Sequence, residues 1–380
     1  MIQYVPRIWA LAKDRPKGWR SLLYNSAMAK ARMAGPLMMP VHITIEPTNL
    51  CNARCPVCET GNGSMARKDG MLDFDLYKKF IDDVAPTTAA LMYYFMGEPF
   101  LHKRSYEMIR YAREKDIYVD SCTNGDFVDA AGIIYSDINE INFQIGGMTQ
   151  KTHEIYRVKS NIEKIHRNLY ALIEERRKNP KSSVQINVGF IVMSHNEHEI
   201  PSFLQWAKEV GIDQANIIDP CVRSVEEGHV FLPKDRKYWF YDEKAFERGV
   251  LRPKHVLNNE CSWVWNAVLV NWDGSVVPCC RDPHGLHVFG NAFERPLREI
   301  WNGPEITGFR RQILTQQGKV EICNLCSGFG VPKLQHAQPM SFEVKLHTLN
   351  AERLNFLDEL DHSVSKDTLV TITRGTSLKD

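Results

Sequence analysis

Short apolar segments alternate with amphipathic ones between residues 41 and 220 of this 380-residue chain. In the amphipathic segments apolar residues recur at helical spacing, as at Phe74, Tyr77, Ile81 and Val84. Strands alternating with helices predict parallel βαβ units, and right-handed crossovers wrap six of them into a partial (β/α)6 TIM-like barrel of the α/β class. The predicted strands are VHITIE (41–46), ALMYYF (90–95), IYVDS (117–121), EINFQI (140–145), VQINVGFIVM (184–193) and ANIID (215–219).

Composition divides the chain into five regions. They are a basic amphipathic helical segment (1–40), the barrel (41–222), a charged and aromatic linker with a helix (223–260), a compact cysteine-rich domain (261–335) and a polar tail with a weak helix at Leu354, Leu357 and Leu360 (336–380). Seven Lys or Arg against Asp14 give the first segment a charge of +6. This segment is expected either to pack as a helical collar or to contact an anionic surface such as a membrane.

The whole chain has a formal charge of +1, which gives no reason to expect nucleic acid as a partner. No apolar run approaches the roughly 18 residues of a membrane span, and the N-terminus has no signal-peptide core. We therefore expect a cytoplasmic protein, with peripheral membrane contact limited to residues 1–40. Ten cysteines in such a protein favour metal or redox chemistry over disulfides.

Seven of these cysteines fall into two patterned groups, of which the first directly follows the first predicted strand. It reads CNARCPVC and comprises Cys51, Cys55 and Cys58. A structural zinc site normally closes with four protein ligands. Three thiolates instead suit three irons of a cubane cluster, which leaves the fourth iron open. GEP (97–99) and TNG (123–125) follow the second and third strands, and the C-terminal ends of parallel strands meet at one rim.

In this order, the three motifs resemble those of the radical S-adenosylmethionine (SAM) superfamily. The resemblance implies that SAM binds the open iron of a [4Fe–4S] cluster and is cleaved to a 5′-deoxyadenosyl radical. The electron would come from an external donor such as flavodoxin or ferredoxin. Met96 replaces the first glycine of the family's GGEP motif, and Gly146 stands where Asp is usual. The implied SAM-binding residues are Gly97, Glu98, Pro99, Thr123, Asn124, Gln144, Arg157 and Ile191.

The second group comprises Cys261, Cys279, Cys323 and Cys326, four thiols that suit zinc or a fully ligated iron–sulfur cluster. The stretch WDGSVVPCCRDPHGLHVFGNAFERPLREIWNG resembles the SPASM/Twitch extension of radical SAM enzymes. That resemblance implies one auxiliary [4Fe–4S] cluster. The adjacent Cys280 is an alternative ligand, and the Gly274-x4-Cys279 spacing favours Cys279.

An auxiliary cluster beside a radical site can accept the second electron of an oxidation. The expected activity is therefore dehydrogenation of a C–H or CH–OH position in a small, sugar-like or lipid-linked substrate. Cys280 and Asp282, with the nearby His284, are candidate catalytic residues, Asp282 as proton acceptor. The alternatives are a peptide-modifying maturase, a redox-neutral epimerase with Cys280 as hydrogen donor, and a non-enzymatic zinc scaffold.

Overall fold

The computed structural model describes residues 16–328, 330, 343–347 and 369–371. Its centre is a ten-stranded sheet with the order β10-β9-β6-β5-β4-β3-β2-β1-β7-β8. All neighbouring strands are parallel except the antiparallel pair β7 and β8. The strands are β1 (His42–Ile45), β2 (Ala90–Tyr93), β3 (Tyr118–Thr123), β4 (Glu140–Ile145), β5 (Gln185–Ile191), β6 (Gln214–Ile218), β7 (Ala267–Val270), β8 (Val276–Val277), β9 (Glu343–His347) and β10 (Leu369–Thr371).

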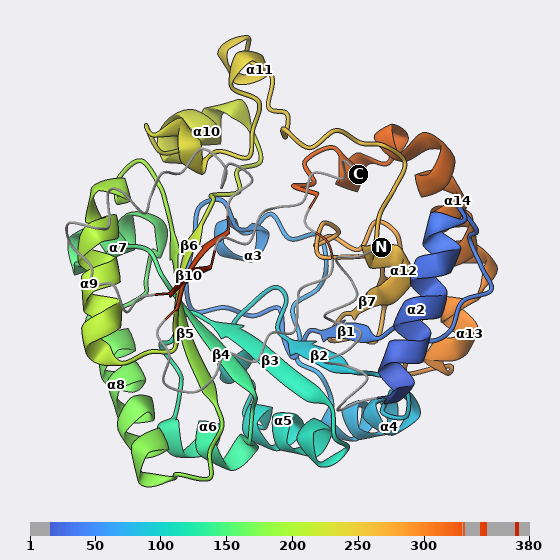
Figure 1. Ribbon diagram of the computed structural model, residues 1–380, viewed down its shortest axis with the longest axis horizontal. Coiled ribbons are helices and arrows are strands. Elements are labelled where there is room, and N and C mark those ends of the chain that lie inside the picture. Colours follow the sequence, from blue (N-terminus) through green and yellow to red (C-terminus); the bar gives the residue numbers. More distant parts are fainter. Residues whose placement is uncertain (1–15, 329, 331–342, 348–368, 372–380) are drawn as a thin grey trace.

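The six strands predicted for the barrel are present as β1 to β6, so the expected α/β partial barrel is confirmed. Helices surround the strands on the outside of the curved sheet (Figure 1). The helices of this half are α3 (Glu59–Asn62), α4 (Phe74–Val84), η2 (Pro99–Leu101), α5 (Ser105–Glu114), α6 (Ala130–Ser136), α7 (Gln150–Tyr156), α8 (Ile162–Lys178), η3 (Glu197–Glu199) and α9 (Ile200–Val210).

Helix α4 shows how the sequence pattern becomes structure. Asp73 caps it by accepting hydrogen bonds from the backbone N–H groups of Asp75 and Leu76. The apolar residues at helical spacing then share one buried face, on which Tyr77 and Ile81 are fully covered. Packing of this face against the sheet, rather than helix propensity alone, stabilises the helix.

The part of the chain after residue 220 forms the rest of the described structure. The predicted linker contains two α-helices and a short 3-10 helix where one helix was expected, and β7 adds to the sheet beside β1. The elements are α10 (Val225–Phe231), η4 (Arg236–Tyr238), α11 (Glu243–Glu247), α12 (Trp263–Asn266), α13 (Leu297–Trp301), α14 (Pro304–Gln316), η5 (Gln317–Lys319) and η6 (Glu321–Cys323). Two strands, β9 and β10, lie within the expected polar tail. The helix expected around Leu357 lies outside the described residues.

The basic N-terminal segment is described from α2 (Pro16–Lys30) onward. Leu22 is buried in a small cluster with Val41 and Ala89. Two tryptophans of the C-terminal half hold the chain after α2, because the indole N–H of Trp265 donates to the Met33 carbonyl and that of Trp301 to the Met38 carbonyl. This part of the segment therefore packs on the main body. No helix in the described part of the chain combines the length and apolarity that a bilayer span needs.

Candidate active site

The first cysteine group lies in the loop between β1 and α3. Cys58 occupies the N-cap position of α3 without a side-chain hydrogen bond to the helix. A side chain at Gly61 would clash with the backbone of Cys55, so the loop folds tightly around that residue. Burial raises the pKa of Cys51 to about 12, and the neighbouring Glu98, Cys55 and Cys58 contribute to this shift. The three thiols therefore lie close together, as a shared metal site requires.

Among the described residues, no three His, Cys, Asp or Glu side chains have the spacing of a site for one metal ion. A cubane cluster binds each thiolate to a different iron, so its cysteines stand further apart than the ligands of a single zinc ion. The thiols of Cys51, Cys55 and Cys58, three donors from one loop, fit the cluster as its protein ligands.

Glu98 joins the GEP and TNG turns. Its carboxylate accepts hydrogen bonds from Thr123 Oγ1 at 2.6 Å, from Asn124 N at 2.8 Å and from Phe100 N at 3.2 Å. Burial raises the pKa of Glu98 to about 7 despite these donors. Gly97 has a φ of 85°, and a side chain there would strike the backbone of the loop before Cys51. Pro99 begins η2 directly after Glu98 and is buried.

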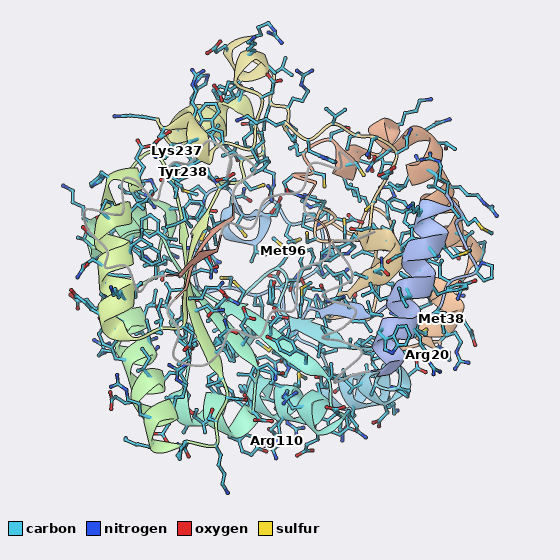
Figure 2. All side chains as sticks on the ribbon, in the orientation of Figure 1. Arg20, Met38, Met96, Arg110, Lys237 and Tyr238 are labelled. Atoms are coloured by element: carbon cyan, nitrogen blue, oxygen red, sulfur yellow. The ribbon has the colours of Figure 1, made fainter. Side chains whose placement is uncertain are left out.

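Asn124 connects these turns to the cysteine loop. Its Nδ2 donates to Asn52 Oδ1 at 2.7 Å and lies 3.8 Å from Cys51 Sγ. The carboxyl ends of β1, β2 and β3 therefore meet around the first cysteine group, as the strand order predicts. Figure 2 shows Met96, from the turn after β2, near the centre of the molecule, whereas Arg110 lies at its outer edge.

Arg157 reaches the same place from the end of α7. Its Nη1 lies 3.9 Å from Cys55 Sγ, and its Nε is buried without a hydrogen-bond partner. An unpartnered guanidinium N–H beside the cluster loop suits the carboxylate that SAM carries. Gly146 leaves the space for this side chain, since a Cβ there would lie 3.0 Å from Arg157 Cγ. The structure thus supplies a reason for glycine at this position.

Gln144 and Ile191 lie on β4 and β5. The Gln144 side chain lies over Gly189, where any Cβ would collide with it, and it also contacts the thiol of Cys122. Ile191 ends β5 partly exposed, and its carbonyl accepts from Asn196 Nδ2 at 2.9 Å. Their roles towards SAM stay predictions.

The second cysteine group gathers from three segments. Cys261 precedes α12, Cys279 follows β8, and Cys323 and Cys326 flank the end of η6. Burial raises the pKa of Cys261 to about 11 and that of Cys323 to about 12, and neighbouring thiols of the group contribute to both shifts. Burial, with the thiols of Cys261 and Cys326, also raises the pKa of Cys279. The four side chains are therefore neighbours in space although Cys261 and Cys326 are 65 positions apart in the sequence.

The loop after Cys279 gives its candidates different environments. Cys280 is exposed. Asp282 is fully buried, and its two oxygens accept hydrogen bonds from Leu286 N at 2.7 Å and His287 N at 2.9 Å. This geometry favours a loop-stabilising role for Asp282 over the expected role of proton acceptor. His284 Nδ1 accepts from Ala66 N at 3.2 Å.

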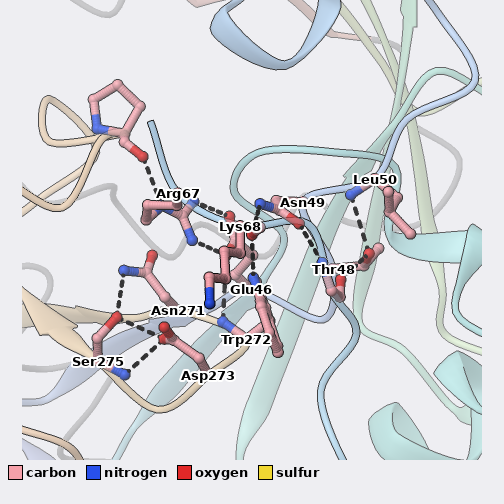
Figure 3. A network of polar contacts seen from close by, with 12 residues as sticks. Glu46, Thr48, Asn49, Leu50, Arg67, Lys68, Asn271, Trp272, Asp273 and Ser275 are labelled. Atoms are coloured by element: carbon pink, nitrogen blue, oxygen red, sulfur yellow. Dashed lines mark hydrogen bonds and ion pairs between the residues drawn. The ribbon is translucent and has the colours of Figure 1, made fainter. Parts of the chain in front are cut away.

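A buried ion pair ties the two cysteine-bearing loops together (Figure 3). Arg67, in the chain after the first group, makes a two-pronged contact with Glu46 at 2.7 Å for each bond. Its Nε donates to the carbonyl of Pro283 in the loop after Cys279, also at 2.7 Å. Burial raises the pKa of Glu46 even though Arg67 opposes the shift. The pair fixes the distance between the loops.

Cys221 stands outside both patterned groups, and no sequence motif indicates its role. Arg223 Nη1 lies 2.7 Å and Arg281 Nη1 3.1 Å from its sulfur. Burial opposes ionisation, but the two guanidinium groups outweigh it and lower the pKa of Cys221. Arg281 also borders Cys280, so this thiol lies near the auxiliary loop. Only the fold brings Arg281 to Cys221 and Arg223.

Comparison with known protein families agrees with this arrangement. The family model for the radical SAM superfamily matches residues 45–207, and the SPASM iron–sulfur cluster-binding domain matches residues 261–327. The second match assigns an iron–sulfur cluster where the cysteine pattern alone also allowed zinc.

Two curated relatives resemble most of the chain. The tungsten-containing aldehyde ferredoxin oxidoreductase cofactor-modifying protein of Pyrococcus furiosus is 23% identical over 320 residues, which is 75% of this chain and 87% of the relative. The AdoMet-dependent heme synthase of Methanosarcina barkeri is 24% identical over 327 residues, which is 76% of this chain and 90% of the relative.

Solved structures share the fold at low sequence identity. SuiB of Streptococcus suis superposes with a TM-score of 0.57 at 13% identity, covering 82% of this chain and 77% of SuiB. Native anSMEcpe with bound AdoMet superposes with a TM-score of 0.54 at 17% identity, covering 79% of this chain and 94% of anSMEcpe. With its cysteine loop at the rim of a parallel partial barrel and a second cysteine group beside it, the chain is a radical SAM protein with a SPASM-type auxiliary-cluster domain.

Proposed function

We propose that this protein is a radical SAM oxidoreductase that removes two electrons from a C–H or CH–OH position of a small, sugar-like or lipid-linked substrate. The two domains imply [4Fe–4S] clusters and SAM. When bound, these groups supply a 5′-deoxyadenosyl radical and an electron acceptor. An external one-electron donor such as flavodoxin or ferredoxin completes the scheme.

One observation carries the proposal: Arg67 fastens the loop that begins at Cys279, one of the four auxiliary cysteines, to the loop of the first cysteine group. Loss of hydrogen from a substrate leaves a carbon radical, and removal of a proton makes that radical strongly reducing. An acceptor at a fixed distance from this radical permits net oxidation, whereas epimerisation needs only a hydrogen donor. The fixed loop geometry therefore favours oxidation.

The chain's own residues would hold the substrate and take up its proton. Asp282 is a poor acceptor because backbone N–H groups already occupy both its oxygens. Cys221 is a better candidate, since Arg223 and Arg281 stabilise its thiolate. Cys280 is exposed and, within the described residues, has no comparable pair of arginines. It stays the candidate hydrogen donor for the alternative reaction, epimerisation.

Reaction in D2O distinguishes oxidation from epimerisation. We expect a product two mass units lighter than the substrate, and Cys280→Ala should keep much of this activity because oxidation needs no returned hydrogen atom. Mass spectrometry measures the mass of the product and the amount that Cys280→Ala forms. A product of unchanged oxidation level with one solvent deuterium, which Cys280→Ala fails to make, would identify an epimerase and overturn the proposal.

A peptide substrate is the second candidate. SuiB has been solved with its precursor peptide SuiA and anSMEcpe with the Kp18Cys peptide, and PqqA peptide cyclases are among the relatives at 20–22% identity. Peptide-dependent consumption of SAM, with a mass change on the peptide, would favour this candidate over a small molecule.

Iron content tests the number of clusters. The grouping of three and four cysteines predicts two cubane clusters, or about eight irons per chain after anaerobic reconstitution. Iron and acid-labile sulfide assays measure this value. About four irons with one zinc per chain would contradict the auxiliary cluster.

A cytoplasmic location with peripheral contact between residues 1–40 and an anionic surface also stays a proposal. The packing of α2 through Leu22 supports the alternative of a helical collar for its described part. Residues 1–15 lie outside the described residues.

A further inference from the structure

Two carboxylates lie side by side on the inner strands. Asp120 of β3 and Glu140 of β4 are register partners in adjacent parallel strands, so both occupy the same face of the sheet. Both are partly exposed. In the described part of the chain neither forms an ion pair with Lys, Arg or His, and this sets them apart from Glu46 with Arg67.

Their environment makes two charges costly. Burial raises the pKa of Asp120 well above its usual value, and the nearby Glu140 raises it further. Glu140 is anchored by three donors: Tyr118 Oη at 3.0 Å, Asn142 Nδ2 at 3.0 Å and Asn187 Nδ2 at 2.7 Å. These contacts orient Glu140 and leave Asp120 without a comparable set of side-chain donors.

The same face holds buried acceptors without partners. Asn187 is fully buried; its Nδ2 points to Glu140, and its Oδ1 has no hydrogen-bond partner. Gln214, the register partner of Asn187 on β6, is 4% exposed and its Oε1 is also unpartnered, while its Nε2 donates to Asn216. Unpaired buried acceptors are rare in folded proteins because each one loses its hydrogen bonds to water without a replacement. This surface therefore has more acceptors than donors.

We propose that this acid-and-amide face, formed by Asp120, Glu140, Asn187 and Gln214, binds an ammonium group of the substrate. An alkylammonium brings one positive charge and up to three N–H donors, which is what the face lacks. The proposal rests on the proposed function and narrows its substrate to an amine-bearing, sugar-like small molecule.

Tyr94 connects this face to the reactive end of the strands. Burial raises the pKa of Tyr94 well above its ordinary value, and Asp120, Cys122, Cys280 and Glu140 add to the shift, so the phenol lies near all four groups. A small amine held at the acidic pair would extend along Tyr94 towards Cys280. Recognition and chemistry would then occur on one continuous surface inside the barrel.

A stability measurement tests whether the acidic pair serves a ligand or the fold. Asp120→Asn should raise the Tm of the substrate-free, reconstituted protein by about 2 °C, because it removes one uncompensated charge. The control is Asp126→Asn: Asp126 is more deeply buried than Asp120 but accepts from Asn52 Nδ2 at 2.7 Å and Asn161 N at 3.3 Å, so its loss should lower Tm. A comparable fall in Tm for Asp120→Asn would make the pair structural and overturn the proposal.

Binding tests the ligand itself. Glucosamine should bind the reconstituted protein saturably in anaerobic calorimetry, while glucose and N-acetylglucosamine, which lack the charge, should bind at least about tenfold more weakly. Asp120→Asn and Glu140→Gln should remove this preference. Binding only of Nα-acetyl-lysine methylamide would assign the face to a peptide lysine, and equal binding of all four probes would exclude ammonium recognition. Neither the Tm assay nor the calorimetry requires turnover. A negative result in these assays would therefore reject the ammonium site, whereas a negative result in D2O would reject the proposed oxidation.

Discussion

Replacing Cys51, Cys55 or Cys58 by alanine should reduce reductive cleavage of SAM to the level of a protein-free control. Each thiol is one of three donors from a single loop, and two thiolates do not hold a cubane with one open iron. The measurement is formation of 5′-deoxyadenosine with dithionite as reductant. Residual cleavage in all three variants would contradict the assignment of this loop as the cluster site.

Cys323→Ala is the matched control because it removes a thiol of the second group. It should keep some uncoupled cleavage of SAM while losing product, provided that circular dichroism shows an intact fold. If Cys323→Ala abolished cleavage as fully as Cys55→Ala, with the fold intact, the proposed division of labour between the two cysteine groups would be wrong.

Loss of the buried guanidinium in Arg67→Met should lower the free energy of unfolding by about 3–5 kcal/mol, since it leaves the charge of Glu46 buried and unpaired. Anaerobic urea titration measures the change. Arg110→Met is the control: Arg110 pairs with Glu114 on the surface of α5, and such pairs contribute at most about 1 kcal/mol.

A second substitution separates charge from packing in the same pair. Combining Arg67→Met with Glu46→Gln removes the stranded charge, so the double variant should regain part of the stability that Arg67→Met lost. Equal losses for Arg67→Met and Arg110→Met would show that the ion pair does not hold the loops together. Loosening these loops should also increase uncoupled cleavage of SAM, because Arg67 holds Pro283 near the first group.

The barrel strands were predictable because their apolar runs are bounded by turns and separated by periodic helices. The predicted EINFQI coincides with β4 (Glu140–Ile145), and ANIID lies within one residue of β6 (Gln214–Ile218). Local periodicity determines such strands. The pairing of β7 with β1 depends instead on contact between segments more than 200 residues apart, which no local pattern encodes.

The site was predictable where a motif carries the chemistry, as for the two cysteine groups and Glu98. It was not predictable where partners come from distant segments: Cys221 with Arg281, or Arg67 with Pro283. Asp282 shows how sequence position can mislead. An acidic residue just after a cluster ligand suggests a catalytic base, whereas in the structure backbone N–H groups donate to its carboxylate. The alternation of Glu140, Asn142 and Gln144 with apolar residues did hold a signal, because it marks a polar inner face on β4.

Strand β1 lies between β2 and β7 and so joins the barrel (41–222), the first unit, to the cysteine-rich domain (261–335), the second unit. All four of its residues are buried, and its backbone is paired on both sides, to β2 in the first unit and to β7 in the second. A fragment ending before residue 261 would leave β1 as an uncovered edge with free N–H and C=O groups beside apolar Ile43 and Ile45. Such edges invite pairing with other chains, so the isolated barrel would aggregate rather than act as a smaller enzyme.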